Sequence, residues 1–292
     1  MPSKYTIHAV LFSVGAIYAG NYIIAKEVMP EYVGPFGLIV IRVIIAAAVF
    51  WIIHAIWIKE KLKSRKDFFL LLRATAFGVV INQLFFFKGL SLTSPINASL
   101  IMTATPILVL ISSAIILKEK ITKLKMLGVL LGCSGAILLI GNSGFSFSGD
   151  TFKGDILVFI NACSYGIYLV LVKPIMDKYH PITVVKWIFT LAIPFVTLVG
   201  FSDLVLVDWD QMPGKIYLSI FYIVAAVTIL AYLLNAWSLR YVNASMVGIY
   251  IYLQPLLASF LAVLLGKDEL TLNKVFFAFL IFSGVYLVSI KK

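Results

Sequence analysis

Ten long apolar runs, separated by short polar connections, take up almost the whole of this 292-residue sequence. A helix needs about 20 apolar residues to cross the hydrocarbon core of a bilayer, and most of these runs come close to that length. Only 13% of the residues are charged while 62% are apolar, which leaves too few polar side chains to cover a water-soluble protein. The sequence therefore predicts an all-α polytopic membrane protein with ten transmembrane helices. The expected helices cover residues 5–25, 36–58, 68–90, 95–117, 124–141, 155–173, 182–201, 216–238, 245–266 and 274–290.

Lysine and arginine residues are distributed unevenly over the connections between these runs. With the N-terminus in the cytoplasm, 16 of the 24 basic residues fall on the cytoplasmic side and six on the other. An excess of positive charge is typical of short cytoplasmic loops. We therefore expect a multi-pass protein of the cell (inner) membrane with both termini in the cytoplasm. The net charge of +11 reports this orientation, so the expected partner is the lipid bilayer and not nucleic acid.

Short motifs recur in the same order in the two halves of the sequence, at offsets of 146 and 149 residues. Each half holds five of the expected helices, an odd number, so the second half must enter the membrane from the opposite side. Inverted repeats of this kind are common among secondary transporters. We expect two five-helix domains, residues 5–141 and 155–290, joined by a segment rich in Gly and Ser. The matching pairs are Gly20 with Gly166, Tyr22 with Tyr168, Pro35 with Pro181, Pro106 with Pro255, and Gly135 with Gly284.

Three groups of residues in these repeats carry a family resemblance. They are Gly20-Asn21-Tyr22 with Pro35 and Arg42, Pro106 with residues 118–122, and residues 250–255 with residues 268–271. Together they resemble the two halves of an EamA-type transporter of the drug/metabolite transporter superfamily. The resemblance covers essentially the whole chain and implies ten helices in two EamA repeats. It also implies the export of amino acids or other small metabolites.

Polar side chains interrupt the apolar runs at several positions. An amide or a tyrosine hydroxyl is costly to expose to lipid, so each must face another helix or a polar cavity. Hydrogen bonding between neighbouring helices is the simpler explanation for any single one of them. As a set they predict a substrate cavity between the two repeats. The residues are the amides Asn21, Asn82, Gln83, Asn161, Asn235 and Gln254, and the tyrosines Tyr18, Tyr165 and Tyr232.

Arg42 is a charged residue that lies well inside an expected helix, about six residues from its start. A charge near the middle of a bilayer costs about 2.5 kcal/mol or more and usually marks function. We expect Arg42 either to bind an anionic group, such as a substrate carboxylate, or to pair with Glu27 or Glu31. No Asp or Glu falls in the middle of an apolar run, which argues against a buried carboxylate relay for protons.

Two prolines, Pro106 and Pro255, occupy corresponding places in the fourth and ninth apolar runs. Each proline removes a backbone hydrogen bond from its helix, and the freed carbonyl can face a cavity. Thr103 and Tyr252 lie three residues before the prolines on the same helix face, so we add them to the expected substrate pathway. We expect the prolines to let these helices bend as gates. A kink that only serves packing is the alternative.

These patterns favour a secondary transporter of small metabolites that works by alternating access to a central site. The family resemblance implies that the direction of transport is export. The chain contains no G-x-x-x-x-G-K-[ST] loop and no H-E-x-x-H motif. We therefore expect no catalytic residues, metal site or cofactor, and a protein that works as a monomer or a homodimer. One alternative is an intramembrane enzyme that uses Arg42, His54 or Lys88. Another is a non-transporting membrane sensor, which would have a sealed core without a polar cavity.

Overall fold

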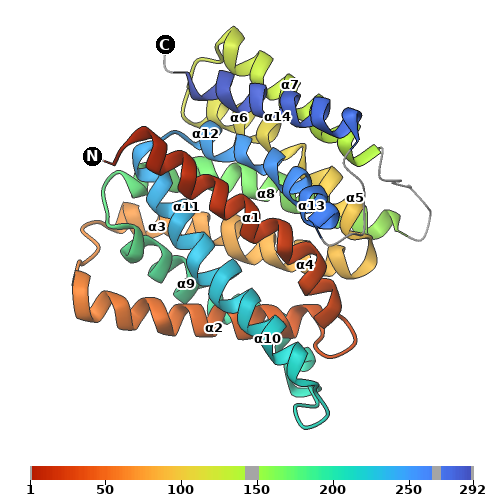
Figure 1. Ribbon diagram of the computed structural model, residues 1–292. Helices are drawn as coiled ribbons and strands as arrows, with labels where there is room; N and C mark the ends of the chain where they lie inside the picture. Colours follow the sequence, from red (N-terminus) through yellow and green to blue (C-terminus); the bar gives the residue numbers. More distant parts are fainter. Residues whose placement is uncertain (1, 142–150, 265–270, 291–292) are drawn as a thin grey trace.

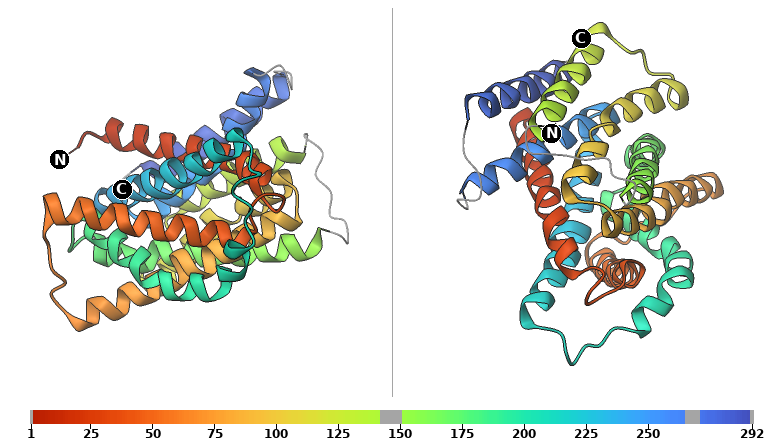
Figure 2. Two further views of the ribbon diagram at one scale, coloured as in Figure 1. Left: turned by 90° about the horizontal axis from the view of Figure 1, so that it is seen from below. Right: turned by 90° about the vertical axis from the view of Figure 1, so that its right-hand side faces the viewer.

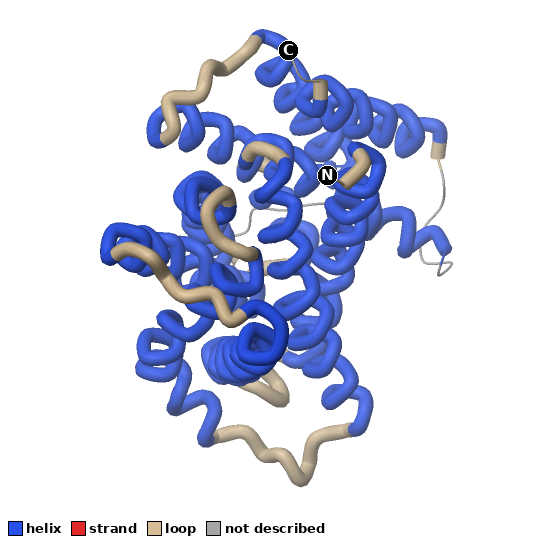
Figure 3. The backbone as a smooth tube through the Cα atoms, turned by 90° about the vertical axis from the view of Figure 1, so that its left-hand side faces the viewer, coloured by secondary structure: helices blue, strands red, loops and turns tan. Residues whose placement is uncertain are grey.

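The computed structural model describes residues 2–141, 151–264 and 271–290. All regular structure within these ranges is helical, and they contain no strand (Figure 3). The prediction of an all-α protein is therefore confirmed. Most of the expected linker, residues 142–150, and residues 268–270 of the second-half motif lie outside the described residues.

The helices follow one another through short connections (Figure 1). Several helical stretches change helix type along their length. The α-helices are α1 (Lys4–Val28), α2 (Pro35–Ile53), α3 (Arg65–Thr75), α4 (Ile81–Leu92), α5 (Pro95–Met102), α6 (Thr105–Ile116), α7 (Lys123–Gly141), α8 (Phe152–Met176), α9 (Pro181–Val205), α10 (Gly214–Tyr222), α11 (Ala231–Tyr241), α12 (Ala244–Ile249), α13 (Leu253–Leu264) and α14 (Leu272–Ser289). The π-helices are η1 (His54–Ile58), η2 (Ala76–Val80) and η3 (Ile223–Leu230), and η4 (Tyr250–Tyr252) is a 3₁₀-helix.

Seven helical stretches in the described part of the chain are long and apolar enough to cross a membrane. Large apolar side chains also cover the outside of the bundle, as at Leu198, which is 85% exposed, and Leu218, which is 71% exposed. Such a surface suits lipid, so the chain is a multi-pass membrane protein. The count of ten crossings stays a prediction. The seven stretches are Lys4–Val28, Pro35–Ile58, Arg65–Leu92, Pro95–Ile116, Phe152–Met176, Pro181–Val205 and Gly214–Tyr241.

The main helix contacts join the first half of the chain to the second (Figures 1 and 2). Helix α2 packs along α9, α7 packs along α14, and α4 packs along α8. Helix α1 in turn contacts α11 and α13. The two halves therefore interlock, and their shared core is formed by helices from both.

Helices α7 and α14 approach each other closely because glycines face the contact. A Cβ atom added at Gly128 would lie 2.8 Å from the carbonyl oxygen of Gly284. One added at Gly284 would lie 2.5 Å from the carbonyl oxygen of Gly128. Small residues let helix backbones meet in membranes, where packing and not the hydrophobic effect holds helices together.

Both prolines of the expected gates follow a break in the helix. Helix α5 ends at Met102, and α6 begins at Thr105 with Pro106 in its first turn. In the second half, α12 gives way to the 3₁₀-helix η4 before α13, which contains Pro255. A proline in the first turn of a helix loses no hydrogen bond, because the first N–H groups have no partner within the helix. Pro106 thus starts a new helix where the sequence suggested an interruption within one.

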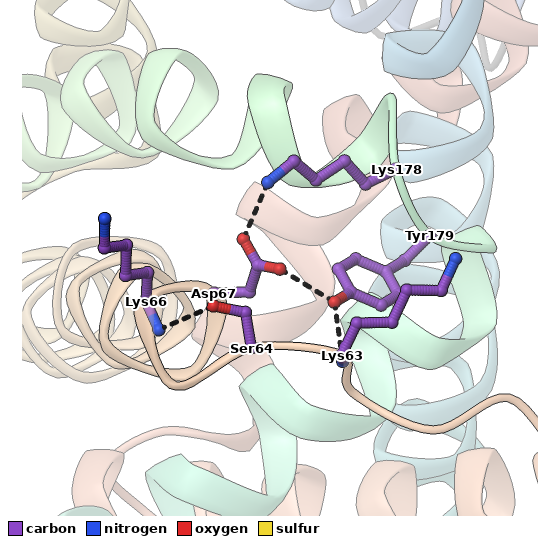
Figure 4. A network of polar contacts seen from close by, with 6 residues as sticks. All are labelled: Lys63, Ser64, Lys66, Asp67, Lys178 and Tyr179. Atoms are coloured by element: carbon purple, nitrogen blue, oxygen red, sulfur yellow. Dashed lines mark hydrogen bonds and ion pairs between the residues drawn. The ribbon is translucent and has the colours of Figure 1, made fainter.

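A polar network joins residues of the two halves of the chain (Figure 4). The carboxylate of Asp67 on α3 accepts from Lys178 Nζ at 2.9 Å and from Tyr179 Oη at 2.8 Å. Tyr179 Oη in turn accepts from the backbone N–H of Lys63 at 2.9 Å. The connection before α3 is therefore fastened to the turn between α8 and α9.

The two ends of the described chain lie at the same end of the molecule (Figure 1). Lys4 and Ser289 line one surface pocket, together with Lys120 and Lys173. Those four side chains, from four separate helices or loops, therefore share one face.

Candidate functional site

A cavity lined by both polar and apolar residues lies among helices of both halves. The centres of water molecules can occupy about 70 Å³ of it, which is room for several waters. Its polar lining residues are Tyr18, Asn21, Tyr22, Arg42, Asn82, Gln83, Asn161, Tyr165, Tyr232 and Gln254. Its apolar lining residues are Phe86, Phe87, Met102, Val227 and Ile251.

Most residues that the sequence predicted for a substrate pathway meet at this cavity. Asn235 of α11 lies just behind the lining, because its Nδ2 donates to Tyr18 Oη and to Tyr165 Oη, both at 3.3 Å. That these side chains bind a substrate stays a prediction. Nine of the twelve residues named from the sequence line the cavity: Tyr18, Asn21, Arg42, Asn82, Gln83, Asn161, Tyr165, Tyr232 and Gln254.

Thr103 and Tyr252, the other two predicted pathway residues, are not brought to the cavity lining. The Thr103 hydroxyl, just after the end of α5, donates to the carbonyl of Leu100 in the last turn of that helix at 2.6 Å. The Tyr252 hydroxyl donates to the carbonyl of Val129 on α7 at 3.2 Å, and its ring fills the space above Gly132. Both side chains therefore stabilise the breaks in their helices in this conformation.

Arg42 is 2% exposed, and it supplies the positive charge of the cavity wall. Its Nε donates to Thr228 Oγ1 at 2.7 Å, and its guanidinium carbon lies 4.3 Å from the centre of the Phe87 ring. The Nη1 atom is buried and has no hydrogen-bond partner. Within the described residues no carboxylate pairs with Arg42, and Glu27 pairs with Lys215 at 3.0 Å instead. The expected pairing of Arg42 with Glu27 is therefore absent from this structure.

Two amides of the cavity wall hold their nitrogen atoms in hydrogen bonds and leave their oxygens unpaired. Gln83 Nε2 donates to Tyr232 Oη at 2.9 Å, and that hydroxyl donates onward to the carbonyl of Gly78 at 3.1 Å. Asn161 Nδ2 donates to the carbonyl of Asn82 at 2.8 Å. The oxygens Gln83 Oε1 and Asn161 Oδ1 are buried without a partner. Each of these two cavity-lining residues therefore carries an acceptor that nothing in the protein uses.

Helix α1 supplies a third unused acceptor and a link across the cavity. Asn21 Oδ1 is also buried without a partner. Tyr22 Oη donates to Gln254 Oε1 on α13 at 3.0 Å. Side chains of the first and second halves thus bond to each other directly around the cavity.

Sequence reasoning missed the apolar part of the site. Phe86, Phe87 and Met102 line the cavity, yet they are apolar residues of the kind that also face lipid. Helical spacing held a usable signal, because Phe86 and Phe87 follow Asn82 and Gln83 by four residues and share their helix face. No sequence signal marked Thr228, because its contact with Arg42 spans 186 residues.

The groups proposed for an intramembrane enzyme do not gather at one place. His54 Nδ1 lies 3.4 Å from Lys186 Nζ, and His54 Nε2 lies 3.0 Å from the carbonyl oxygen of Glu60. Lys88 lies near the ring of Phe36, at 5.9 Å from its centre. Among the described residues, no three His, Cys, Asp or Glu side chains come together where a metal ion could bind.

Comparisons with known proteins agree with the fold. A model of the EamA-like transporter family matches residues 6–141 and 152–290. An uncharacterized transporter of Archaeoglobus fulgidus is 26% identical over 98% of this chain and 98% of its own length. The uncharacterized transporter YyaM of Bacillus subtilis is 25% identical over 70% of this chain and 67% of its own length. A solved crystal structure shares the fold at a TM-score of 0.76, with 18% identity over 98% of this chain and 96% of that one.

Proposed function

Because the chain belongs to the EamA-like transporter family, we propose that it is a secondary transporter of small metabolites such as amino acids. Substrate binds in the cavity between the two halves and is exported across the inner membrane. The observation that carries this proposal is the polar, partly unpaired lining of that cavity. Burying Arg42 and three unpaired amide oxygens costs free energy. A bound polar ligand offsets this cost by pairing with them.

The proposal includes alternating access between two inverted five-helix repeats. The helix contacts support it. By their order in the two halves, α1 corresponds to α8 and α4 corresponds to α11. The contact of α4 with α8 then has a counterpart in the contact of α11 with α1. Exchanging the halves leaves the contacts of α2 with α9 and of α7 with α14 unchanged. The matching helix breaks before Pro106 and Pro255 provide a bending point in each half.

The orientation in the membrane belongs to the same proposal, with both termini in the cytoplasm. Lys4 and Ser289 line the same surface pocket, which fits an even number of crossings. Lys120 and Lys173 share that pocket, and basic residues are typical of the cytoplasmic face.

The two alternatives are less well supported. A membrane sensor would have a sealed core, whereas this core contains a cavity with a polar lining. An intramembrane enzyme would need reactive groups at one depth, whereas Arg42 and His54 have separate partners.

Transport by the purified protein in proteoliposomes tests the proposal. We expect uptake or efflux of at least one member of a panel of labelled amino acids, nucleosides and sugars, above that of protein-free liposomes. Val227→Trp fills the cavity and should abolish this transport. Leu198→Trp, at a position 85% exposed on the outside, is the matched control and should transport normally. Failure of the wild-type protein to move any compound of the panel would remove the proposal.

A further inference from the structure

We propose that the cavity recognises a small carboxylate that carries a hydrogen-bond donor on the neighbouring carbon atom. Arg42 binds the carboxylate, and Gln83 and Asn161 accept from the donor. This inference rests on the proposed function and assigns a binding role to each of three side chains. An α-amino acid and an α-hydroxy acid both have the required chemistry.

Arg42 is suited to a carboxylate by what it already binds and by what it leaves free. A guanidinium group presents five N–H donors in a planar fork that matches the two oxygens of a carboxylate. Thr228 takes Nε, and the Phe87 ring covers one face of the group, so the guanidinium plane is held in place. Nη1 has no partner, and no acid among the described residues neutralises the charge. A bound carboxylate supplies both the missing acceptor and the missing charge.

The amide oxygens require a second kind of group on the same ligand. The Asn161 nitrogen must be the atom that faces Asn82, because a backbone carbonyl can only accept. Tyr232 gives its proton to Gly78, so it must accept from the Gln83 nitrogen. Both amide orientations are therefore set by chemistry, and the two free atoms are acceptors. An ionised carboxylate has no donor to give them, whereas an ammonium or a hydroxyl does.

The rest of the lining favours an apolar remainder for this ligand. Phe86, Met102, Val227 and Ile251 contribute carbon surface to the same cavity. Among the described residues no Asp or Glu lines the cavity, so none of them attracts a ligand whose charge is only positive. A carboxylate with an apolar side chain matches both the polar and the apolar residues of the lining.

Four compounds with the carbon skeleton of leucine test the assignment on the purified wild-type protein. They are L-leucine, its α-hydroxy acid, its α-keto acid, which lacks the donor, and 3-methylbutylamine, which lacks the carboxylate. Binding is measured by the rise in melting temperature in detergent and by calorimetry. We expect leucine, the hydroxy acid or both to bind, and the keto acid and the amine to bind at least about tenfold more weakly, the loss typical of one charge-assisted hydrogen bond. Binding of leucine alone identifies an ammonium as the donor, and binding of the hydroxy acid alone identifies a hydroxyl.

The assignment is wrong if the keto acid or the amine binds as well as the best ligand, or if none of the four binds. Either result leaves the proposed transport function standing, because that function is tested by the wider panel of metabolites. If no compound of the panel is transported but leucine binds as expected, the transport function is wrong and the binding site stands.

Three variants locate the carboxylate contact. Arg42→Gln should weaken binding of the best ligand at least about tenfold, since it removes a charge-assisted hydrogen bond. Arg42→Lys keeps the charge without the fork and should recover part of the loss. Arg73→Gln replaces an exposed arginine of α3 and should bind as the wild type does. Equal binding by Arg42→Gln and Arg73→Gln would overturn the role of Arg42. If Arg42→Gln fails to fold, the four compounds on the wild-type protein still decide.

Discussion

Several side chains donate hydrogen bonds to backbone carbonyls at helix ends and within π-helices. Tyr232 donates to Gly78, and Ser164 donates to Phe77, both within the π-helix η2. A π-helix shifts the hydrogen-bond register, so carbonyls near it lose their ordinary partners. In lipid such a group must find another donor inside the protein.

Lys26 of α1 is the strongest case of this kind and gives a prediction about stability. Its Nζ donates to the carbonyls of Leu90, Ser91 and Thr93 where α4 ends, each at 2.9 Å. Lys26→Met leaves these carbonyls unpaired and should lower the free energy of unfolding by about 2 kcal/mol, the value of charge-assisted hydrogen bonds. Thermal unfolding in detergent measures the loss.

Lys215→Met is the matched control for this variant. Lys215 pairs with Glu27 at 3.0 Å, but its side chain is 73% exposed. An exposed ion pair contributes about 0–1 kcal/mol, so the control should unfold close to the wild-type temperature. Equal losses of unfolding free energy in the two variants would show that the contacts of Lys26 stabilise the protein no more than an exposed ion pair does.

His180 predicts a dependence of stability on pH. It caps α9 by accepting the N–H of Ile182 on Nδ1 at 3.3 Å, which requires the neutral ring. Burial, followed by the positive charge of Arg240, lowers the pKa of His180 below its usual value of 6.5. The folded state then favours the neutral ring, so this stability is present above pH 6.5 and is lost as the pH falls below it.

His180→Asn keeps a capping side chain that does not titrate. The melting temperature of the wild-type protein should therefore fall more between pH 7.5 and pH 5 than that of the variant. Parallel curves for the two proteins over this range would contradict the role of His180.

At the scale of the helices, glycines allow two helix backbones to pack closely. The contact between α7 and α14 depends on glycine, because a Cβ atom at Gly284 would lie 2.5 Å from the carbonyl oxygen of Gly128. Gly284→Ala should destabilise the protein by about 1–3 kcal/mol through overpacking. Gly214→Ala, where an added Cβ meets nothing within 4 Å, should be neutral or slightly stabilising. Equal melting temperatures for these two variants would mean that α7 and α14 do not pack as closely as described.

The helices themselves could be predicted because lipid leaves a spanning segment no other way to pair its backbone. The helix α2 with η1, for example, covers Pro35–Ile58 where residues 36–58 were expected. The π-helices η2 and η3 and the break at Thr103 could not be predicted, because they depend on contacts with other helices.

The residues of the candidate site, too, could be predicted from the sequence only in part. Asn21, Asn82 and Asn161 stood out because an amide in an apolar run needs a partner. The contact of Arg42 with Thr228 is a product of tertiary packing, so no local pattern announces it. Tyr252 was predicted from its place three residues before Pro255, but its hydroxyl donates to the carbonyl of Val129, because a helix break can use a hydroxyl as well as a cavity can.

At the scale of the whole molecule, two interlocked halves enclose a cavity that holds only several waters in this conformation. A metabolite therefore needs the halves to move apart at the cavity. The polar network of Asp67, Lys178 and Tyr179 fastens the halves at one end, so it must loosen if the cavity opens there (Figure 4). Alternating access requires the opposite end to open in turn.

The accessibility of the cavity from the two sides of the membrane tests this account most directly. Val227→Cys places a thiol in the cavity wall, in a background where Cys133 and Cys163 are replaced by serine. The protein is reconstituted in one orientation, and a membrane-impermeant thiol reagent is added to either side. We predict that the thiol reacts from both sides, and that a transported metabolite slows both reactions. Reaction from one side alone, or from neither, would contradict alternating access to a shared central cavity.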